Sequence, residues 1–432
     1  MSPKSVTMVA ALRNALPYIN AHRGRIFIVS LSGATLQKPN FPHLVHDLAL
    51  LNSLGARLVL AHGARPNAAQ IHSARPEYAH GLRVTDSETL EVILAAVGSA
   101  RARIEGLFSL GLANSPMAGA RLRVVSGNFI LARPLGVRHG IDYQHTGEVR
   151  RVDTDALRRH LEAQEIVLLP PLGYSPTGEI FHLSAEAVAT ATAIELNADK
   201  LIFFIDGTGI HAADGKLIAQ LNVDEAMQMI DTAPESLKGA LTGAVQALRR
   251  GVGRAHLISH DIDGALLLEL FTRDGHGTLI DRGSYDSLRV ARIEDVGGIL
   301  ALITPLETEG VLVRRSRERL ENEIDYFVVA ERDGAIIGCA ALYPFPDERA
   351  GELACLAVHP DYRRQRRGEL LLNYLEQHAR QLQLQQLFVL TTHASHWFQE
   401  RGFITVTVNF LPVARQALYN WQRNSKILVK SL

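Results

Sequence analysis

The sequence predicts an α/β protein with two domains: a larger three-layer domain built on a mainly parallel sheet, and a smaller α+β domain. Three observations predict this. The chain has 432 residues, which is too long for one ordinary domain. Strand-like and helix-like segments alternate up to about residue 282, as they do when helices connect parallel strands. Beyond the turn-rich stretch DRGSYDS, at 281–287, strands joined by a tight turn appear instead.

Composition and charge narrow the function classes. Hydrophobic residues make up 47% and charged residues 21%, which is typical of a globular protein with buried cores. Lys+Arg and Asp+Glu both total 45, so the formal net charge of zero argues against a dedicated nucleic-acid binder. The only cysteines are Cys339 and Cys355, and no CxxC or HExxH motif occurs, so we expect no metal. Because Arg13, Asn14 and Arg23 interrupt the N-terminal apolar runs, we expect a cytoplasmic protein without a membrane partner.

The elements of the first domain, assigned to residues 1–282, follow from residue spacing. Residues 8–20 have the apolar spacing of one helix face. Residues 25–33 form a β-branched apolar run that ends in small residues, which predicts a buried strand and a turn. Residues 41–55 predict a helix that ends on a glycine. Further expected segments are strands at 56–66, 122–127, 165–171, 200–205 and 254–259, and a helix at 184–198.

The second domain is assigned to residues 289–432, after a linker at 283–288. Residues 287–303 predict a strand followed by a helix, and residues 326–342 predict a hairpin around Arg332-Asp333-Gly334. Further expected segments are strands at 351–358 and 384–392 and helices at 367–382 and 396–403.

A strand, a donor-rich turn and a helix follow one another at 351–379. This order places free backbone N–H groups and the positive end of a helix dipole at the turn, where an anionic pyrophosphate can bind. Four arginines, Arg363, Arg364, Arg366 and Arg367, add positive charge to the same turn. The segment therefore predicts a phosphate-binding loop.

This loop resembles that of the GNAT acetyltransferases, whose pattern is Q/R-x-x-G-x-G/A. Arg363 and Gly368 fit its ends, and Arg366 stands where the first glycine belongs. The resemblance implies that acetyl-CoA is a co-substrate. It also implies a cofactor-binding set of Leu356, Ala357, Val358, Arg363, Arg364, Gln365, Arg366, Arg367, Gly368 and Glu369.

Over essentially the whole chain, the sequence resembles the two-domain bacterial N-acetylglutamate synthase family. The likeness rests on GELACLAV, RRSRE, LFVLTT, WFQERGF and YNWQRNSKILVK. It implies transfer of an acetyl group from acetyl-CoA to the α-amino group of L-glutamate, the first step toward arginine. It also implies a homo-oligomer, a hexamer in this family.

The resemblance assigns roles to individual residues near the predicted loop. Glu352 is expected to take a proton from the substrate ammonium, directly or through water. The backbone N–H of Leu356, or a neighbour, is expected to bind the thioester oxygen. These enzymes often use a tyrosine as the acid in the last short helix, but Phe398 stands there. Thr391 or Thr392 could donate instead, or the thiolate leaves unaided.

Glutamate recognition is expected to rest on arginine, because its bidentate fork matches a carboxylate. Arg315 and Arg423 fall where the family places substrate-binding arginines, with Ser425 as a neutral donor beside the second. Cys355 is expected to be a small residue that lends its backbone to the substrate site.

The first domain resembles the amino-acid kinase family, closest to N-acetylglutamate kinase. Where the kinases carry a lysine in the first strand, this chain has Ser30, and their glycine loop has become His62-Gly63-Ala64-Arg65-Pro66. Phosphoryl transfer depends on neutralising the phosphate charge. The resemblance therefore implies that the fold is retained for regulation or assembly and that the kinase activity is lost.

Arginine-sensitive relatives of these kinases bind arginine between an N-terminal helix and the final strand–helix region. The resemblance implies an allosteric L-arginine site and feedback inhibition, with Tyr18 packing on the ligand and Glu269 binding its guanidinium. Its carboxylate would be bound by a turn that includes Gly275, Gly277 and Thr278. Alternatively, the N-terminal helix only docks subunits.

Three other functions remain open at this point. A bifunctional synthase and kinase is disfavoured by Ser30 and Ala64. A non-catalytic arginine sensor is disfavoured by Glu352 and the two arginine sites. A synthase-like enzyme could also take another amino acid or a polyamine.

Overall fold

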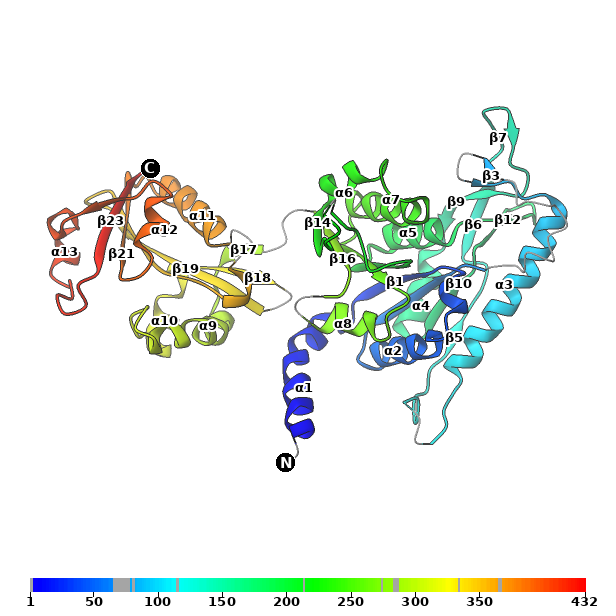
Figure 1. Ribbon diagram of the computed structural model, residues 1–432, viewed down its shortest axis with the longest axis horizontal. Helices are drawn as coiled ribbons and strands as arrows, with labels where there is room; N and C mark the ends of the chain where they lie inside the picture. Colours follow the sequence, from blue (N-terminus) through cyan, green and yellow to red (C-terminus); the bar gives the residue numbers. More distant parts are fainter. Residues whose placement is uncertain are drawn as a thin grey trace. The chain divides into compact units, whose positions relative to one another are not determined.

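The computed structural model divides the chain into two compact units, Met1–Gly283 and Ser284–Leu432 (Figure 1). It describes residues 3–64, 78–79, 82–113, 116–212, 214–272, 275–282, 287–332, 335–363 and 367–432. Most of the expected linker, at 283–286, lies outside the described residues. Among the described helices, none combines the length and the apolar character needed to cross a bilayer.

The first unit is built on an eight-stranded sheet in which strands far apart in sequence are neighbours. Every neighbouring pair is parallel except β15 and β16. In sheet order, the strands are β14 (Gln220–Asn222), β16 (Thr278–Asp281), β15 (Arg254–Ser259), β13 (Lys200–Ile205), β1 (Ile26–Leu31), β2 (Arg57–His62), β10 (Ile166–Leu169) and β5 (Val124–Val125). The predicted parallel sheet is confirmed.

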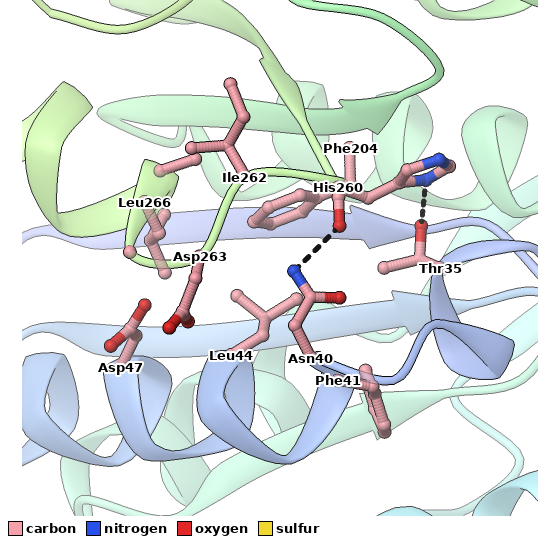
Figure 2. A pocket seen from close by; sticks show the side chains of 12 residues that line it. Thr35, Asn40, Phe41, Leu44, Asp47, Phe204, His260, Ile262, Asp263 and Leu266 are labelled. Atoms are coloured by element: carbon pink, nitrogen blue, oxygen red, sulfur yellow. Dashed lines mark hydrogen bonds between the residues drawn. The ribbon is translucent and has the colours of Figure 1, made fainter.

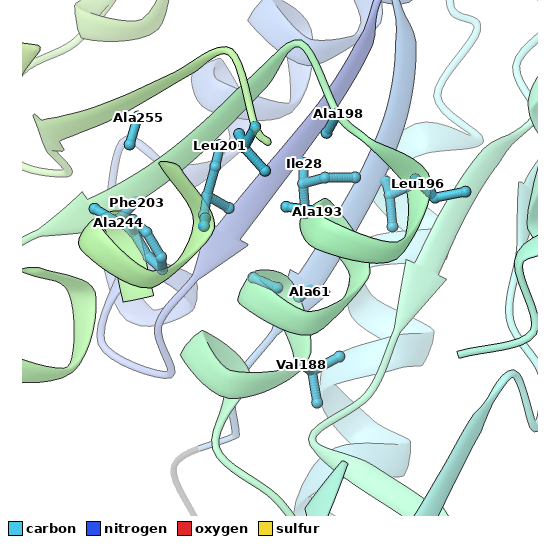
Figure 3. Packing of buried hydrophobic residues seen from close by; sticks show 14 of the residues in the cluster. Ile28, Ala61, Val188, Ala193, Leu196, Ala198, Leu201, Phe203, Ala244 and Ala255 are labelled. Atoms are coloured by element: carbon cyan, nitrogen blue, oxygen red, sulfur yellow. The ribbon is translucent and has the colours of Figure 1, made fainter. Parts of the chain in front are cut away.

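Both faces of this sheet are covered by helices, which explains why its central strands are predominantly apolar rather than alternating. Phe27 and Val29 of β1 pack on one side, whereas Ile28 packs on the other. The first side is covered by α2 (Phe41–Ser53), α3 (Ser87–Phe108) and α8 (Ala265–Phe271), and the second by α4 (Thr154–Glu162), α5 (Ala185–Leu196) and α7 (Glu235–Arg249). Figure 3 shows the core on the second side, where Phe203 and Ile28 of the sheet pack near helix residues such as Ala193 and Ala244.

A second, four-stranded sheet in this unit has no counterpart among the expected elements. Its order is β12 (Ile180–His182), β11 (Leu172–Tyr174), β6 (Ile130–Pro134) and β9 (Gly147–Val152). Two short hairpins accompany it, formed by β3 (Tyr78–Ala79) with β4 (Leu82–Arg83) and by β7 (Val137–Arg138) with β8 (Ile141–Asp142). A further helix, α6 (Val223–Met229), follows β14.

The N-terminal helix α1 (Pro3–His22) is longer than expected and packs against α8. Its last residue anchors it, because the buried His22 side chain lies 2.8 Å from the Leu270 carbonyl oxygen. Leu12 and Leu16, toward its middle, are exposed.

The second unit is a seven-stranded sheet in which only β20 and β21 are parallel neighbours. In sheet order, the strands are β17 (Ser287–Val290), β18 (Phe327–Arg332), β19 (Ala335–Phe345), β20 (Ala350–Val358), β21 (Gln386–Thr391), β23 (Lys426–Ser431) and β22 (Ile404–Val406). The expected hairpin is β18 with β19. One face packs on α11 (Arg367–Gln381) and the other on α9 (Val296–Thr308). The remaining helices are α10 (Arg317–Asn322), α12 (Ser395–Gln399) and α13 (Val413–Gln416).

Candidate active site

The sheet of the second unit opens between its two parallel strands. β20 and β21 are in register only near their starts, and the last pair is Glu352 with Phe388. Beyond Glu352, β20 remains paired with β19 as far as Val358. The backbone groups of residues 353–358 that face β21 are therefore outside the ladder and can bind a ligand. Leu356, Ala357 and Val358, expected at the cofactor, lie along this wedge.

A β-bulge lies in the same stretch of β20. Cys355 and Leu356 stand opposite the single residue Ala340, between the pairs Ala354–Ala341 and Ala357–Cys339. Cys355 has a φ of +53°, in the left-handed region that few residues other than glycine adopt. The bulge takes the backbone around Leu356 out of the regular ladder, as an oxygen-binding N–H would require.

The predicted phosphate loop connects β20 to the first turn of α11. Arg363 is exposed, and its Nε donates to the Val358 carbonyl oxygen at 3.2 Å. Arg364, Gln365 and Arg366 lie outside the described residues. The start of α11 still presents first-turn N–H groups toward this loop.

Arg367 was expected to add an exposed positive charge to the phosphate-binding loop, but the structure buries it. It is only 3% exposed, and its guanidinium lies 5.0 Å from the centre of the Tyr362 ring. Its Nη1 donates to the Tyr362 carbonyl oxygen at 3.2 Å. The physical reason is that a weakly hydrated, planar guanidinium stacks well on an aromatic ring. Arg367 thus packs the loop against the helix.

Gly368 and Glu369 follow in the same turn. A Cβ at Gly368 would lie 3.2 Å from the Trp397 ring, so the first turn of α11 approaches α12 closely. Glu369 lies 4.0 Å from Arg401, a contact too long and too exposed to add much stability.

Glu352 is held by an arginine that the sequence did not indicate. Arg415, in α13, donates through Nε to Oε2 at 2.6 Å and through Nη2 to Oε1 at 3.0 Å. The two side chains are only 12% and 21% exposed, so this is a bidentate pair with limited solvent screening. A carboxylate oxygen keeps further acceptor capacity beyond one bond. Glu352 is therefore fixed in position, and a proton can reach it only from directions that Arg415 leaves open.

Arg315 lies in the loop between α9 and α10. Its backbone N–H donates to Glu307 at 2.9 Å, and its Nη1 donates to the Val313 carbonyl oxygen at 3.2 Å. Its Nε is buried and has no hydrogen-bond partner within the described part of the chain. An unsatisfied buried donor costs about 1–3 kcal/mol, which a substrate carboxylate could recover.

Arg423 and Ser425 lie beside the same loop. Arg423 Nη2 donates to the carbonyl oxygens of Val311 at 2.6 Å and of Gly310 at 3.3 Å. These carbonyls lie just before Arg315 in sequence, so the loop at 310–315 connects the two arginines. Ser425 is buried, and its carbonyl accepts from the Tyr419 hydroxyl at 2.8 Å.

Two further residues, Tyr343 and Glu323, adjoin Arg315 and carry no sequence signal. The Tyr343 hydroxyl donates to Glu323 at 2.5 Å and also interacts with Arg315. Burial, and then the Glu323 carboxylate, raise the pKa of Tyr343. Burial opposes ionisation of Glu323, but the hydrogen bonds from Tyr343 and Arg319 outweigh it and lower the pKa of that carboxyl. Tyr343 and Glu323 thus place a hydroxyl and a negative charge beside the Arg315 guanidinium.

Cys355 also lies within reach of the Arg315 charge. The Cys339 thiol lies 3.6 Å from the Cys355 carbonyl oxygen. A hydrogen bond from Cys339 lowers the pKa of the Cys355 thiol, and Arg315 lowers it further, against the effect of burial. The structure thus brings Arg315 and Cys355 together, as expected for one substrate site.

Thr391 ends β21, on the other side of the wedge from β20. Its hydroxyl oxygen accepts from the backbone N–H of Ala394 at 3.0 Å and of His393 at 3.3 Å. A hydroxyl that accepts can still donate its own proton. The expected tyrosine position, Phe398, is buried in α12.

In the first unit, the residues expected to bind arginine lie close together but are already bonded to one another. Glu269, with a 4% exposed side chain, lies 2.7 Å from His256 Nδ1 and accepts from the His276 N–H at 2.6 Å. Burial opposes ionisation of Glu269, but His256 and the turn N–H groups lower its pKa, whereas burial lowers the pKa of His256. A neutral imidazole therefore donates to an ionised carboxylate.

The turn after α8 fits tightly around this carboxylate. Gly275 has a φ of +64°, and a Cβ there would lie 2.7 Å from Glu269 Oε2, so only glycine is accommodated. The Thr278 hydroxyl is fully buried and donates to the Ile218 carbonyl oxygen at 2.7 Å. Tyr18 is half-buried on α1, which packs against the helix that carries Glu269. An arginine guanidinium would thus have to compete with His256 for Glu269.

A sheet that splays at a bulge, followed by a loop and a helix N-terminus, defines the second unit as an acetyltransferase of the GNAT class. The GNAT acetyltransferase family model matches residues 299–403, and the amino acid kinase family model matches residues 25–259. The chain is 54% identical to an amino-acid acetyltransferase of Pseudomonas putida (strain GB-1) and 55% identical to that of Azotobacter vinelandii (strain DJ / ATCC BAA-1303). Each match covers 98% of both proteins.

Solved structures agree. The N-acetylglutamate synthase from Neisseria gonorrhoeae complexed with coenzyme A and L-arginine is 40% identical, with a TM-score of 0.88 over 98% of this chain and 99% of that one. The same enzyme complexed with coenzyme A and N-acetyl-glutamate is 41% identical, with a TM-score of 0.63 over the same shares. The chain belongs to the amino-acid acetyltransferase family, and the resemblance to the N-acetylglutamate synthases is confirmed. It is an acyltransferase with acetyl-CoA as co-substrate.

Proposed function

We propose that the acceptor is the α-amino group of L-glutamate, so that the chain catalyses the first step of arginine biosynthesis. The observation that carries the proposal is the buried Arg315 Nε without a partner in the described chain, beside Cys355 on the wedge. A carboxylate is the group that such a donor accepts best. The N-acetyl-glutamate complex of the Neisseria gonorrhoeae relative supports this choice.

The chemistry is a direct attack of the amine on the thioester. Glutamate arrives as an ammonium, and Glu352 removes a proton, directly or through water. The amine then attacks the acetyl carbonyl, whose developing negative charge is bound by the Leu356 N–H at the bulge. When the intermediate collapses, the C–S bond breaks and the thiolate of coenzyme A departs. Thr391, at the end of β21, donates to it, or the thiolate leaves unaided.

Substrate positioning falls to the two arginines. Arg315 and Arg423, with Ser425, bind the two carboxylates of glutamate, while the loop at 310–315 sets their spacing. An amino acid that lacks the second carboxylate leaves one guanidinium unpaired, which disfavours its binding.

The first unit is proposed to be a kinase-like domain without kinase activity that senses L-arginine. Ser30, buried in β1, has no charge with which to neutralise a transferring phosphate. The L-arginine complex of the Neisseria gonorrhoeae relative supports L-arginine as a ligand, and we place the site of feedback inhibition near Glu269 by resemblance. We expect the enzyme to act in the cytoplasm as a homo-oligomer, a hexamer by resemblance, with the exposed Leu12 and Leu16 of α1 available for docking.

The test is a thiol-release assay on the purified chain with acetyl-CoA and a panel of acceptors: glutamate, glutamine, aspartate, ornithine and spermidine. Glutamate should give the highest kcat/KM. A second arm supplies N-acetylglutamate with ATP and measures ADP, which should stay at background. Faster turnover of a polyamine would overturn the acceptor assignment, ADP release would support the bifunctional enzyme, and no turnover with any acceptor would favour a pure sensor.

A further inference from the structure

Three neighbouring strands of the first unit end at one edge of its sheet. β15, β13 and β1 are adjacent and parallel, so their carboxyl ends meet. Asp206 directly follows β13, and His260 and Asp261 directly follow β15. The chain runs outward from β1 through β2 on one side and through β13 on the other, so this edge lies at a topological switch point. Ligands of open α/β sheets bind at such points.

His260 is a buried ring with one nitrogen oriented by the chain. Its side chain is 1% exposed. Its Nδ1 lies 3.1 Å from the Thr35 hydroxyl, and Figure 2 shows the ring directed at Thr35. The Asn40 side chain donates to the His260 carbonyl oxygen at 3.0 Å and holds the backbone. Thr35 therefore orients the ring, and Asn40 fixes the backbone that carries it.

The second ring nitrogen, Nε2, lies close to the Asp206 carboxylate without a hydrogen bond to it. His260 Nε2 lies 2.8 Å from Asp206 Oδ1, yet the direction of the ring N–H does not make this contact a hydrogen bond, and no other group in the described chain bonds to it. Asp261 Oδ2 lies 3.7 Å away. A buried nitrogen is thus aimed at two carboxylates without a directed bond to either.

These distances fit three ligand atoms around one cation better than a hydrogen bond between the ring and a carboxylate. One donor atom from each of the three residues lies within 4.8 Å of the others. Neighbouring ligands at about 2.1 Å from an octahedral ion lie roughly 3 Å apart and need no proton between them. Imidazole with carboxylates suits divalent first-row transition ions.

Two carboxylates and one lysine leave this edge with a negative local charge, which favours a cation. Lys38 pairs with the far oxygen of Asp261, at 2.6 Å from Oδ1, and neutralises one of the two carboxylates. The second carboxylate, on Asp206, is 59% exposed and can adjust to a ligand.

We propose that Asp206, His260 and Asp261 bind a divalent first-row transition ion at the switch point of the first unit. Nε2 and the Asp206 carboxylate, which lie close together without a hydrogen bond, each form a coordinate bond to this ion. In this state Nδ1–H donates a hydrogen bond to the Thr35 hydroxyl oxygen, which leaves the Nε2 lone pair facing the ion. Because the ligands follow different strands, binding joins the loops after β13 and β15 and stabilises the unit.

The experiment uses the full chain, stripped with chelator and titrated with Co²⁺, whose visible absorption reports nitrogen and oxygen coordination. One Co²⁺ should bind per chain and raise the Tm. Asp206→Asn and Asp261→Asn should each weaken this binding at least tenfold. Thr35→Val should weaken it roughly tenfold as well, because it removes the group that orients the ring.

The matched control is Asp263→Asn, two positions further along and 62% exposed, which should bind Co²⁺ like the wild type. The carboxylates of Asp206 and Asp261 are themselves at least half exposed, so these variants should fold. The proposal is overturned if the wild type shows no Co²⁺ absorption band, or if Asp206→Asn and Asp261→Asn bind Co²⁺ as tightly as the Asp263→Asn control.

Discussion

Arg415 donates two hydrogen bonds to the Glu352 carboxylate, of 2.6 and 3.0 Å, at the point where the pairing of β20 with β21 ends. The pair joins the short helix α13 to the strand that carries the proposed base. Glu352 therefore has a fixed position before any substrate binds, which is the condition for efficient proton transfer in a confined site.

The first prediction concerns Glu352 itself. Glu352→Gln keeps the shape of the side chain but removes its basicity, so turnover near neutral pH should fall by roughly two to four orders of magnitude. Acetyl-CoA affinity, measured by titration calorimetry, should not change. Glu348→Gln, on the exposed turn before β20, is the matched control and should behave like wild type. Near-normal turnover of Glu352→Gln would remove this residue from the mechanism.

Arg415 should act through Glu352 as a positioning residue. Arg415→Gln releases the carboxylate, and a displacement of about 1 Å can lower turnover by roughly a hundredfold. Because the hydrogen bonds of Arg415 in the described chain go to Glu352 and to the Leu418 carbonyl oxygen, the loss should appear in kcat while the KM for acetyl-CoA stays constant. Arg415→Lys, which keeps the charge without the fork, should be intermediate. Arg317→Gln, at an exposed arginine of the same unit, is the control. A change in acetyl-CoA KM alone would contradict the positioning role.

Arginine should inhibit the wild-type enzyme, and the inhibition should depend on Glu269 and Tyr18. Since Glu269 is bonded to His256 and the turn at 275–278, the ligand must replace these contacts, and the coupling should be modest, about 1–3 kcal/mol. Initial rates against arginine concentration should show blunted inhibition in Glu269→Ala and Tyr18→Ala, with basal activity retained. Glu235→Ala, at an exposed carboxylate on α7, should remain fully sensitive. If calorimetry detects no arginine binding to the intact protein, the first unit is only a scaffold.

Asp47 should make the first unit more stable in mild acid. It lies on α2 facing Asp263, as Figure 2 shows, and burial, followed by repulsion from Asp263, raises its pKa from 3.8 to about 6. Between these values the folded state holds a proton that the unfolded state has lost. Stability from this group is therefore greatest below about pH 4 and falls as the pH rises through 6.

The measurement is urea unfolding of wild type and Asp47→Asn at several pH values. The difference in midpoint between the two proteins should grow as the pH rises from 4 to 6, with the variant favoured at pH 7. Because Asp47 is partly solvated, the effect should be smaller than full burial would give. A difference that does not vary with pH would show that Asp47 titrates normally.

The parallel sheet of the first unit could be predicted because its strands are buried on both faces. β1 and β13 are buried at every position and apolar except at Ser30 and Lys200, a pattern that hardly depends on their neighbours. The sheet of β6, β9, β11 and β12 could not be predicted in this way. β11 has three residues and is in register with β6 at a single pair, so only tertiary packing defines it.

The candidate site likewise has features that the sequence indicates and features that only tertiary structure reveals. The position of Glu352 at the start of a strand follows from local sequence, and the choice of Arg315 as a candidate rests on resemblance. The ion pair between Arg415 and Glu352 joins residues 63 positions apart, and Arg415 lies in a four-residue helix. No local sequence pattern encodes such a contact. The charge pattern likewise did not reveal that Arg367 stacks on Tyr362, since a run of arginines normally indicates a solvated surface.

The most direct test of the central claim is the ratio of kcat/KM for glutamate to that for glutamine, in wild type and in Arg315→Ala and Arg423→Ala. Losing one charged hydrogen-bond partner costs about 1.5–3 kcal/mol, so wild type should prefer glutamate by roughly 10- to 150-fold. Removing the arginine that binds the side-chain carboxylate should collapse this ratio toward one, with the KM for acetyl-CoA unchanged. A wild type that acetylates glutamine as well as glutamate, or arginine variants that alter only acetyl-CoA use, would contradict the account.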